Sequence, residues 1–465
     1  MEIYSPFEVD IAELQADNLA VLKNTPEGWY IEYKQAFANS STAAKSISAY
    51  ANTYGGWLFY GIKESDQRTA GEFIGVSLEE IPIIEQKIRS GISDSVSPTP
   101  FFSTKIVYGP NPAIGLPEDK AIIVVHVPMG NNAPYVHNSG RIYRRVAESS
   151  DPVAETDRHF LDLLWQRGQQ TKDRFSDFIK EPLELSEGES GATYIKIYFF
   201  LDPWLQKYAT KHLSFEEFAT LMASAETDSG GIPFDNNFAM NKGYVARQAA
   251  GNIYNNLVFT WKYYHRGISE ISLPINTLSF NDLHELYTHL DGYDHKNEYI
   301  KICQDIKIKF GRILDLSQLY INLNSIVKRN RVLFESAGIT DPVYAKIMID
   351  EVWRKIPFFD LSETNDFFSR YGLPVIQDKQ YFFPPGIGPE SCLYLKPSYD
   401  ITTGQQIDDH NLDYIHAYFL FIGIAQILGV PANTMLLGDN GTNKLLAMGR
   451  RAGPATRART DRLKS

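Results

Sequence analysis

The chain has 465 residues, of which 43% are apolar, and its formal net charge is −11 with a pI near 5.5. This length predicts two or three domains with sizeable cores. The acidic balance argues against broad nonspecific binding to nucleic acid, so any such binding must be confined to a local basic groove. The two cysteines, Cys303 and Cys392, lie far apart in the sequence, which argues against a disulfide framework or a zinc knuckle.

The N-terminal residues do not form a targeting signal. Residues 1–6 lack the basic start and apolar core of a secretory signal. The longest apolar stretch, residues 418–430, is interrupted by Gln426 and is too short to cross a bilayer. We therefore expect a reduced, cytoplasmic protein with no membrane partner.

Acidic and basic residues alternate in the first predicted strand, within residues 27–34. In an extended strand Glu32 and Lys34 point to the same face, and Glu27 precedes them. This set suits hydrolysis of a phosphodiester, because carboxylates hold a divalent cation that activates water while a lysine neutralises charge on the phosphoryl group. The alternative is an ordinary amphipathic strand with solvated charges.

A helix, a glycine turn and a second strand follow. Residues 41–51 carry small and apolar residues at helical spacing, and residues 57–62 are an apolar, aromatic run typical of a buried strand. Glu64 comes just after that strand. Glycines in the turn allow the backbone angles that a helix terminus needs. The residues predicted to form this turn are Asn52, Gly55 and Gly56.

A nucleotide-binding function of the glycine-rich segment is less favoured by its sequence. No P-loop string occurs in the chain. The turn also runs from a helix into a strand, so no helix N-terminus would face a bound phosphate there. ATP hydrolysis is therefore not expected.

Arginines are interleaved with a tyrosine in residues 140–145, where a hairpin is predicted. The side chains concerned are Arg141, Tyr143, Arg144 and Arg145. Arginines beside an aromatic ring clamp phosphates and stack on bases in single-stranded nucleic-acid sites. The alternative is an exposed hairpin whose charge is balanced by Glu148 and Asp151.

Taken together, these motifs resemble the Schlafen AlbA-like domain over residues 20–165. The shared pattern is a glutamate five residues ahead of Glu-aromatic-Lys, then a serine-containing helix that ends in Ala-Asn-Thr-x-Gly-Gly-aromatic-Leu-aromatic-x-Gly-Ile. An apolar strand at 121–128, Ala-Pro-Tyr at 133–135 and Tyr-x-Arg at 143–145 are similar to the end of the family's domain.

The resemblance implies a nucleic-acid-processing module. In Schlafen-type nucleases an acidic triad is the metal-dependent centre that cleaves RNA. By motif position the triad falls on Glu27, Glu32 and Glu64, which would bind Mg²⁺ or Mn²⁺. The family usually has Asp at the third position, so Glu64 lengthens that arm by one methylene.

The remainder of the chain shows no resemblance to a known family. A helix is predicted at 156–166, and Tyr299 to Leu314 contains apolar residues at steps of three and four, which predicts one buried helix face. Alternation at 271–275 predicts a strand, with Pro274 favouring a sheet edge. The expected domains are 1–168, Schlafen AlbA-like; 169–190, linker; 191–446, mainly helical; and 447–465, a basic flexible tail.

The sequence thus predicts an α+β protein, with a mixed sheet in its N-terminal domain. The favoured function is a metal-dependent endoribonuclease that acts on structured RNA such as tRNA, in bacterial antiviral defence, with Lys34 stabilising the phosphoryl charge. RNA is preferred over DNA as the partner. A noncatalytic DNA- or RNA-binding regulator and a nucleotide-sensing subunit of a defence complex are the alternatives. Only one copy of the domain is recognised, whereas animal Schlafen cores have two similar lobes, so a homodimer is our hypothesis.

Overall fold

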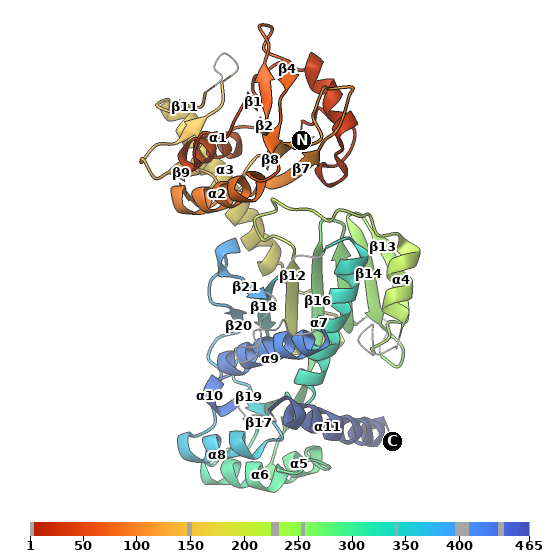
Figure 1. Cartoon of the computed structure of the whole chain (residues 1–465). Helices are drawn as coiled ribbons and strands as arrows, with labels where there is room; N and C mark the ends of the chain where they lie inside the picture. The colour runs from red at the N-terminus through yellow and green to blue at the C-terminus, as the bar shows by residue number, and fades with distance from the viewer. Residues whose placement is uncertain are drawn as a thin grey trace. The chain divides into compact units, whose positions relative to one another are not determined.

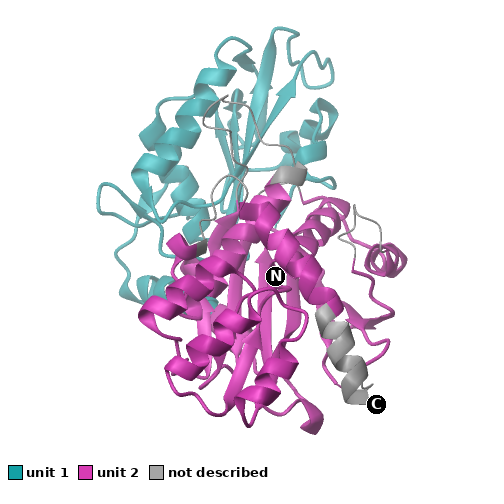
Figure 2. Cartoon of the chain, turned by 90° about the horizontal axis from the view of Figure 1, so that it is seen from below, with its two compact units in different colours: residues 1–174, 204–206 teal, residues 175–203, 207–465 magenta. Residues whose placement is uncertain are grey.

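The structure is a computed structural model that describes residues 4–146, 151–224, 232–252, 256–339, 343–395, 409–435 and 441–464. The chain divides into two compact units (Figure 2). The first contains residues 1–174 and 204–206, and the second contains residues 175–203 and 207–465. Both units combine helices with strands, which confirms the predicted α+β class.

A mixed five-stranded sheet forms the centre of the first unit (Figure 1). Its order is β1-β2-β8-β5, and β7 also pairs with β8. Strands β1 and β2 are parallel, whereas β8 runs antiparallel to β2, β5 and β7. The mixed sheet that the sequence analysis predicted is therefore confirmed. The strands are β1 (Ile31–Lys34), β2 (Gly55–Tyr60), β5 (Val76–Ser77), β7 (Ser103–Tyr108) and β8 (Lys120–Pro128).

Each face of this sheet is covered by a different set of elements. Helices α1 (Ser40–Asn52) and α2 (Ile81–Ser95) bury residues such as Ile47 and Ile88 against one face. Two 3-10 segments, η1 (Ile11–Glu13) and η2 (Ala16–Asn24), cover the other face. Three short pairs complete the unit: β3 (Ile62–Glu64) with β4 (Ala70–Phe73), β6 (Val96–Ser97) with β9 (Val136–His137), and β10 (Tyr143–Arg144) with β11 (Val153–Ala154).

The predicted order of strand, helix, glycine turn and strand is confirmed in β1, α1 and β2. Helix α1 starts at the Asn39 cap, whose side chain accepts a hydrogen bond from the Thr42 amide at 2.9 Å. After the helix, Gly55 has φ +78°. A Cβ there would lie 2.7 Å from the Val127 carbonyl oxygen and 2.8 Å from the Met129 amide nitrogen, so only glycine fits against β8.

The helix predicted at 156–166 is longer than expected. Helix α3 runs from Arg158 to Lys180, so residues 169–180 of the predicted linker are helical. The predicted tail at 447–465 also differs, because the backbone is helical in α11 (Gly441–Lys464). Both segments are rich in polar residues, and such a composition favours irregular structure where no apolar period indicates a helix.

A ten-stranded sheet organises the second unit, which the prediction of a mainly helical domain did not include. Its order is β13-β14-β15-β16-β12-β18-β20; in addition β17 pairs with β16 and β19, and β21 pairs with β18. The strands are β12 (Thr193–Phe200), β13 (Asn236–Met240), β14 (Gly243–Gln248), β15 (Phe259–Tyr264), β16 (Ile268–Phe280), β17 (Gly311–Asp315), β18 (Val343–Asp350), β19 (Ile356–Phe358), β20 (Gln380–Phe383) and β21 (Leu393–Leu395).

Helices pack against this sheet around one continuous core. They are α4 (Phe215–Ala223), α5 (Leu283–His289), α6 (Lys296–Asp305), α7 (Leu319–Ser336), α8 (Ser362–Tyr371), α9 (Asp409–Ile427), α10 (Ala432–Met435) and α11. The single helix predicted from Tyr299 to Leu314 is instead α6 followed by β17. The predicted strand at 271–275 lies inside β16. Residues 271 and 272 pair with both β12 and β15, whereas Pro274 pairs with β12 alone, so β16 has an edge at Pro274 as predicted.

Within the part of the chain that the structure describes, no helix has the length and apolar character needed to span a bilayer.

Replacing Gly55 with alanine should destabilise the first unit by about 2–5 kcal/mol, because positive-φ strain adds to the clash with β8. Gly115 is the matched control. Its φ is +73° but a Cβ would meet no atom within 4 Å, so Gly115→Ala should cost only about 1–2 kcal/mol. Urea denaturation measures both values. Equal losses in the two variants would contradict the close approach of Gly55 to β8.

His126 on β8 should make stability fall in acid. Its ring lies 4.3 Å from that of Trp57, and burial lowers its pKa from 6.5 to about 4, although Asp10 opposes the shift. His126 is therefore harder to protonate in the folded state than in the unfolded state. Its contribution to the free energy of unfolding is complete above about pH 6.5 and is lost as the pH falls towards 4. Between pH 7 and pH 5 the wild type should lose about 1–2 kcal/mol more than His126→Gln in urea denaturation. Identical losses would show that His126 titrates normally.

Candidate functional site

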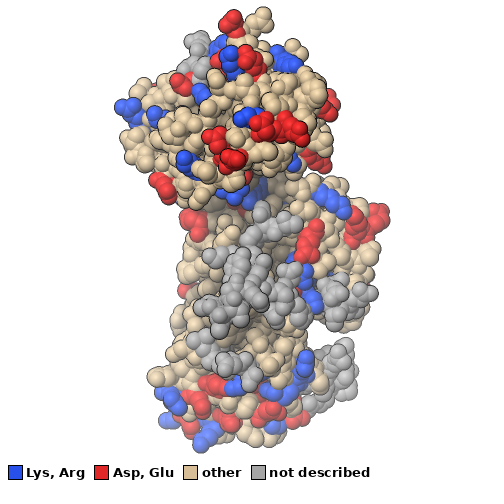
Figure 3. All heavy atoms as spheres, in the orientation of Figure 1, with Lys and Arg blue, Asp and Glu red and all other residues tan. Residues whose placement is uncertain are grey.

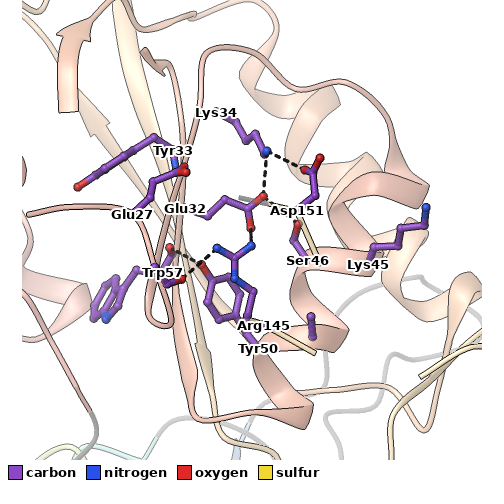
Figure 4. Close-up of polar contacts among 12 residues, drawn as sticks. Glu27, Glu32, Tyr33, Lys34, Lys45, Ser46, Tyr50, Trp57, Arg145 and Asp151 are labelled. Atoms are coloured by element: carbon purple, nitrogen blue, oxygen red, sulfur yellow. Dashed lines mark hydrogen bonds and ion pairs between the residues drawn. The ribbon is translucent and has the colours of Figure 1, made fainter. Parts of the chain in front are cut away.

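A buried ion pair between Glu32 and Arg145 lies at the centre of the first unit (Figure 4). Both side chains are 0% exposed, and the Arg145 Nη1 atom lies 3.1 Å from Glu32 Oε2. The guanidinium also donates to the Gly28 carbonyl at 3.1 Å and lies 5.1 Å from the centre of the Tyr50 ring. The charges thus compensate each other where neither is hydrated.

The Asn52 side chain fixes the segment that carries Arg145. Its amide nitrogen donates to the carbonyls of Tyr135 at 2.8 Å and Tyr143 at 3.0 Å, and its oxygen accepts from the Tyr135 amide at 2.8 Å. The Arg145 amide donates to the hydroxyl of Thr53 at 3.0 Å. The end of α1 therefore serves as the attachment point for residues 135–145.

Lys34 occupies the other side of the Glu32 carboxylate. Its Nζ lies 3.1 Å from Glu32 Oε1 and 3.4 Å from Asp151 Oδ1, and its side chain is 28% exposed. Burial lowers the pKa of Lys34, but the two carboxylates outweigh burial and raise the pKa above its usual value. The Ser46 hydroxyl donates to Glu32 Oε1 at 3.2 Å. Lys34 is therefore a stable, partly exposed cation.

A small pocket opens beside Lys34 at the N-terminal end of α1. Its polar lining consists of Lys34, Asn39, Thr42 and Ser46, and its remaining walls are apolar. The N-terminus of a helix carries partial positive charge, and the ammonium group of Lys34 adds a full charge. The pocket has a volume of about 20 Å³, so it can take a single anionic oxygen, such as one oxygen of a phosphate.

The three carboxylates predicted to bind a metal lie in different surroundings. Glu32 is enclosed as described above. Glu27 is 6% exposed, and its Oε1 accepts from the Tyr33 amide at 2.6 Å. Glu64, at the end of β3, is exposed and pairs with Arg68 at 3.6 Å. Two of the three carboxylates are buried, because backbone and arginine donors can satisfy them there.

These residues do not fit a divalent cation as they are arranged. Among the described residues no group of three His, Cys, Asp or Glu side chains is placed to hold a metal ion. Both oxygens of Glu32 already bind cationic groups or a hydroxyl. The predicted Mg²⁺ or Mn²⁺ site on Glu27, Glu32 and Glu64 is therefore not formed by this arrangement of side chains.

The arginine-rich segment is also more buried than predicted. Arg145 and Tyr143 are 0% and 5% exposed, so neither presents a free surface for a ligand. Arg144 is 30% exposed, pairs with Glu155 at 2.5 Å and packs on the Phe160 ring. Arg141 is exposed. Of the proposed balancing acids, Asp151 pairs with Lys34, whereas Glu148 lies outside the described residues.

Comparison with known proteins agrees with this architecture. Residues 27–154 match the family model described as Schlafen, AlbA_2. These residues form a Schlafen AlbA-like domain. The family indicates a nucleic-acid-related function for the domain, and the match does not extend to residues 155–465.

Other comparisons add little to the Schlafen AlbA-like assignment. One similar solved structure is the DIP2311 protein from Corynebacterium diphtheriae, with 20% identity over 27% of this chain and 22% of that chain, and a TM-score of 0.19. A likeness this low carries no functional argument. No curated protein matches the chain.

Several residues of the site carried no sequence signal of their role. Asn39, Thr42 and Ser46 line the pocket beside Lys34, although the helix was recognised only by its apolar spacing. The helical period could have indicated Thr42 and Ser46, because they are four residues apart and lie on one helix face. Arg145 as the partner of Glu32 could not be read locally, because the two residues are 113 positions apart.

Replacing Arg145 with methionine should destabilise the Schlafen AlbA-like domain by about 3–5 kcal/mol, because Glu32 would lose its buried partner. Arg158→Met is the control, since the Arg158 side chain is 94% exposed in its pair with Asp162 and should contribute less than about 0.5 kcal/mol. Urea denaturation gives the stability, and hydrogen exchange of β1 and β2 assigns the change to this domain. Losses of similar size would disprove the structural role of the buried pair.

Proposed function

We propose that the Schlafen AlbA-like domain binds the phosphate backbone of nucleic acid, RNA in preference to DNA, at the pocket beside Lys34. The observation that carries this proposal is the charged Lys34 ammonium group among Asn39, Thr42 and Ser46 at the start of α1. Lys45 lies on the same helix, one turn further, and is partly exposed. The helix end and the two lysines suit a chain of phosphates.

The surface charge favours binding of nucleic acid at a local site over binding by a broad positively charged surface. Basic and acidic side chains are intermixed on the face of the first unit that Figure 3 shows, with no continuous basic stripe. The total charge of −11 would repel a polyanion at long range. Affinity must therefore come from a few well-placed contacts, and the pocket beside Lys34 supplies them.

Endoribonuclease activity is the second candidate. The specific observation in its favour is that Arg68 links two acids of the predicted triad. Its carbonyl accepts from the Glu27 amide at 2.7 Å, and its side chain pairs with Glu64 at 3.6 Å. Metal-dependent cleavage of structured RNA such as tRNA in antiviral defence would require these two carboxylates to converge with Glu32. Binding without cleavage ranks first because Glu32 is already occupied. A homodimer and a cytoplasmic location stay predictions.

Lys34→Ala should weaken binding of a labelled RNA by about tenfold at low salt and reduce the slope of affinity against salt by about one, as expected when one phosphate contact is lost. Lys63→Ala is the control, because Lys63 is an exposed lysine of the same domain that pairs with Glu72. Fluorescence anisotropy over a salt series, with RNA and DNA of the same sequence, measures affinity and preference. No binding by the wild type, or equal loss in both variants, would overturn the proposal.

Cleavage is tested on the same RNA with Mn²⁺ or with EDTA. Binding without cleavage in either condition supports the binding module. Metal-dependent cleavage that is lost in Glu64→Gln would instead establish the nuclease, and Glu64 is suited to this test because its exposed side chain should tolerate the change without loss of fold. Glu32 is unsuitable, because its replacement would leave Arg145 buried without its carboxylate partner.

A further inference from the structure

Four aromatic side chains form a continuous cluster at one end of β1 and β2. Tyr4 and Tyr30 stack with ring centres 4.5 Å apart, Tyr30 and Tyr54 are 6.2 Å apart, and Trp29 meets Tyr54 edge-on at 5.7 Å. Tyr4 and Tyr54 are 38% and 49% exposed, and Trp29 and Tyr30 are partly exposed. We call Tyr4, Trp29, Tyr30 and Tyr54 the aromatic platform.

The aromatic platform is not part of the hydrophobic core. Other large aromatic residues of the same sheet, such as Trp57 and Phe59, are 3% exposed or less. Tyr4 and Tyr54, in contrast, remain open to solvent although their burial would be favourable. Adjacent exposed rings of this kind mark an interaction surface more often than isolated ones do.

The backbone that carries the rings is held firmly. The Trp57 indole nitrogen donates to the Tyr4 carbonyl at 3.1 Å, and the Trp57 amide donates to the Tyr30 carbonyl at 2.7 Å. Tyr54 follows the end of α1 and precedes Gly55, which is packed against β8. The platform is therefore preorganised, which reduces the entropy that a ligand must supply on binding.

Two guanidinium groups lie beside the platform segments. Arg145 donates to the carbonyl of Gly28, next to Trp29, and Arg167 donates to the carbonyl of Thr53, next to Tyr54, each at 3.1 Å. Both guanidinium groups are engaged with backbone carbonyls, so they hold the platform segments in place and do not face a ligand. The rings themselves complement a planar ligand, and the unpaired bases of nucleic acid are planar.

We propose that the aromatic platform stacks unpaired bases of single-stranded nucleic acid whose backbone contacts the pocket beside Lys34. This inference rests on the proposed function. Strand β1 joins the two places, since Tyr30 directly precedes it and Lys34 ends it. The strand spans roughly 10 Å, or about three stacked nucleotides at about 3.4 Å each. A single-stranded segment must therefore have at least this length to contact both.

The test uses the full chain and two fluorescent probes, an oligouridylate of about 12 nucleotides and an abasic strand with the same number of phosphates. Trp29→Ala and Tyr54→Ala should each weaken binding of the oligouridylate by about tenfold or more, as expected for loss of one stacked base. Neither variant should change binding of the abasic strand. Tyr54→Phe should bind like the wild type, because it keeps the ring.

Tyr108→Ala is the matched control, because Tyr108 is a 61% exposed tyrosine of the same unit. It pairs with Ala121 near one end of β8, whereas Gly55, next to Tyr54, pairs with Pro128 at the other end. Tyr108→Ala should leave both affinities unchanged, and circular dichroism checks that every variant is folded. If the wild type binds both probes equally, or if the platform variants bind the oligouridylate as the wild type does, stacking is disproved while backbone binding stands. If the wild type binds neither probe, the proposed function itself fails.

Discussion

The Schlafen AlbA-like domain depends on the buried ion pair between Glu32 and Arg145. A carboxylate inside a protein is strongly destabilising unless a cation and hydrogen-bond donors replace its hydration. Glu32 lies on β1, in the interior beside α1, so the fold requires a partner there. That partner comes from a segment 113 positions later. The pair therefore joins the first strand of the domain to its last segment, and the Asn52 contacts hold that segment in register.

The same pair limits the chemistry of the site. Glu32 occupies a motif position that implies a metal ligand, yet its two oxygens face Arg145 on one side and Lys34 with Ser46 on the other. A divalent cation at Glu32 would have to displace either the Arg145 guanidinium, which is 0% exposed, or the Lys34 ammonium group. Displacement of Arg145 would leave its charge buried and unpaired, which is as unfavourable as the loss of the carboxylate's partner. Lys34, in contrast, keeps a partly exposed face without disturbing the pair.

The sequence predicted those parts of the fold that depend on neighbouring residues. The strand, helix and glycine turn from β1 to β2 follow from local spacing and from backbone angles that glycine favours. The prediction of one helix from Tyr299 to Leu314 is wrong, because apolar residues at steps of three and four continue from α6 into β17. Strand β18 is buried on both faces along most of its length, so it lacks the alternation that identifies half-buried strands.

The candidate site was harder to predict because burial, and not spacing, decides what its residues do. Tyr143 and Arg145 are two positions apart, but spacing does not indicate that both side chains point inward. The partner of Arg145 had to be a carboxylate on a distant strand, and no local pattern identifies such a pair. The exposed aromatic residues were hard to predict for the opposite reason. Trp29 and Tyr30 are of residue types that usually lie in a core, yet both are partly exposed.

The position of β1 explains how one short strand would organise the two contacts with nucleic acid that we propose. Glu32, inside the strand, is fixed by charges on both sides. The aromatic platform at its start offers flat surfaces, and Lys34 at its end offers a cation. Because stacking does not discriminate strongly between bases and a lysine does not read sequence, this arrangement favours recognition of single strands by shape and charge over recognition of a particular sequence.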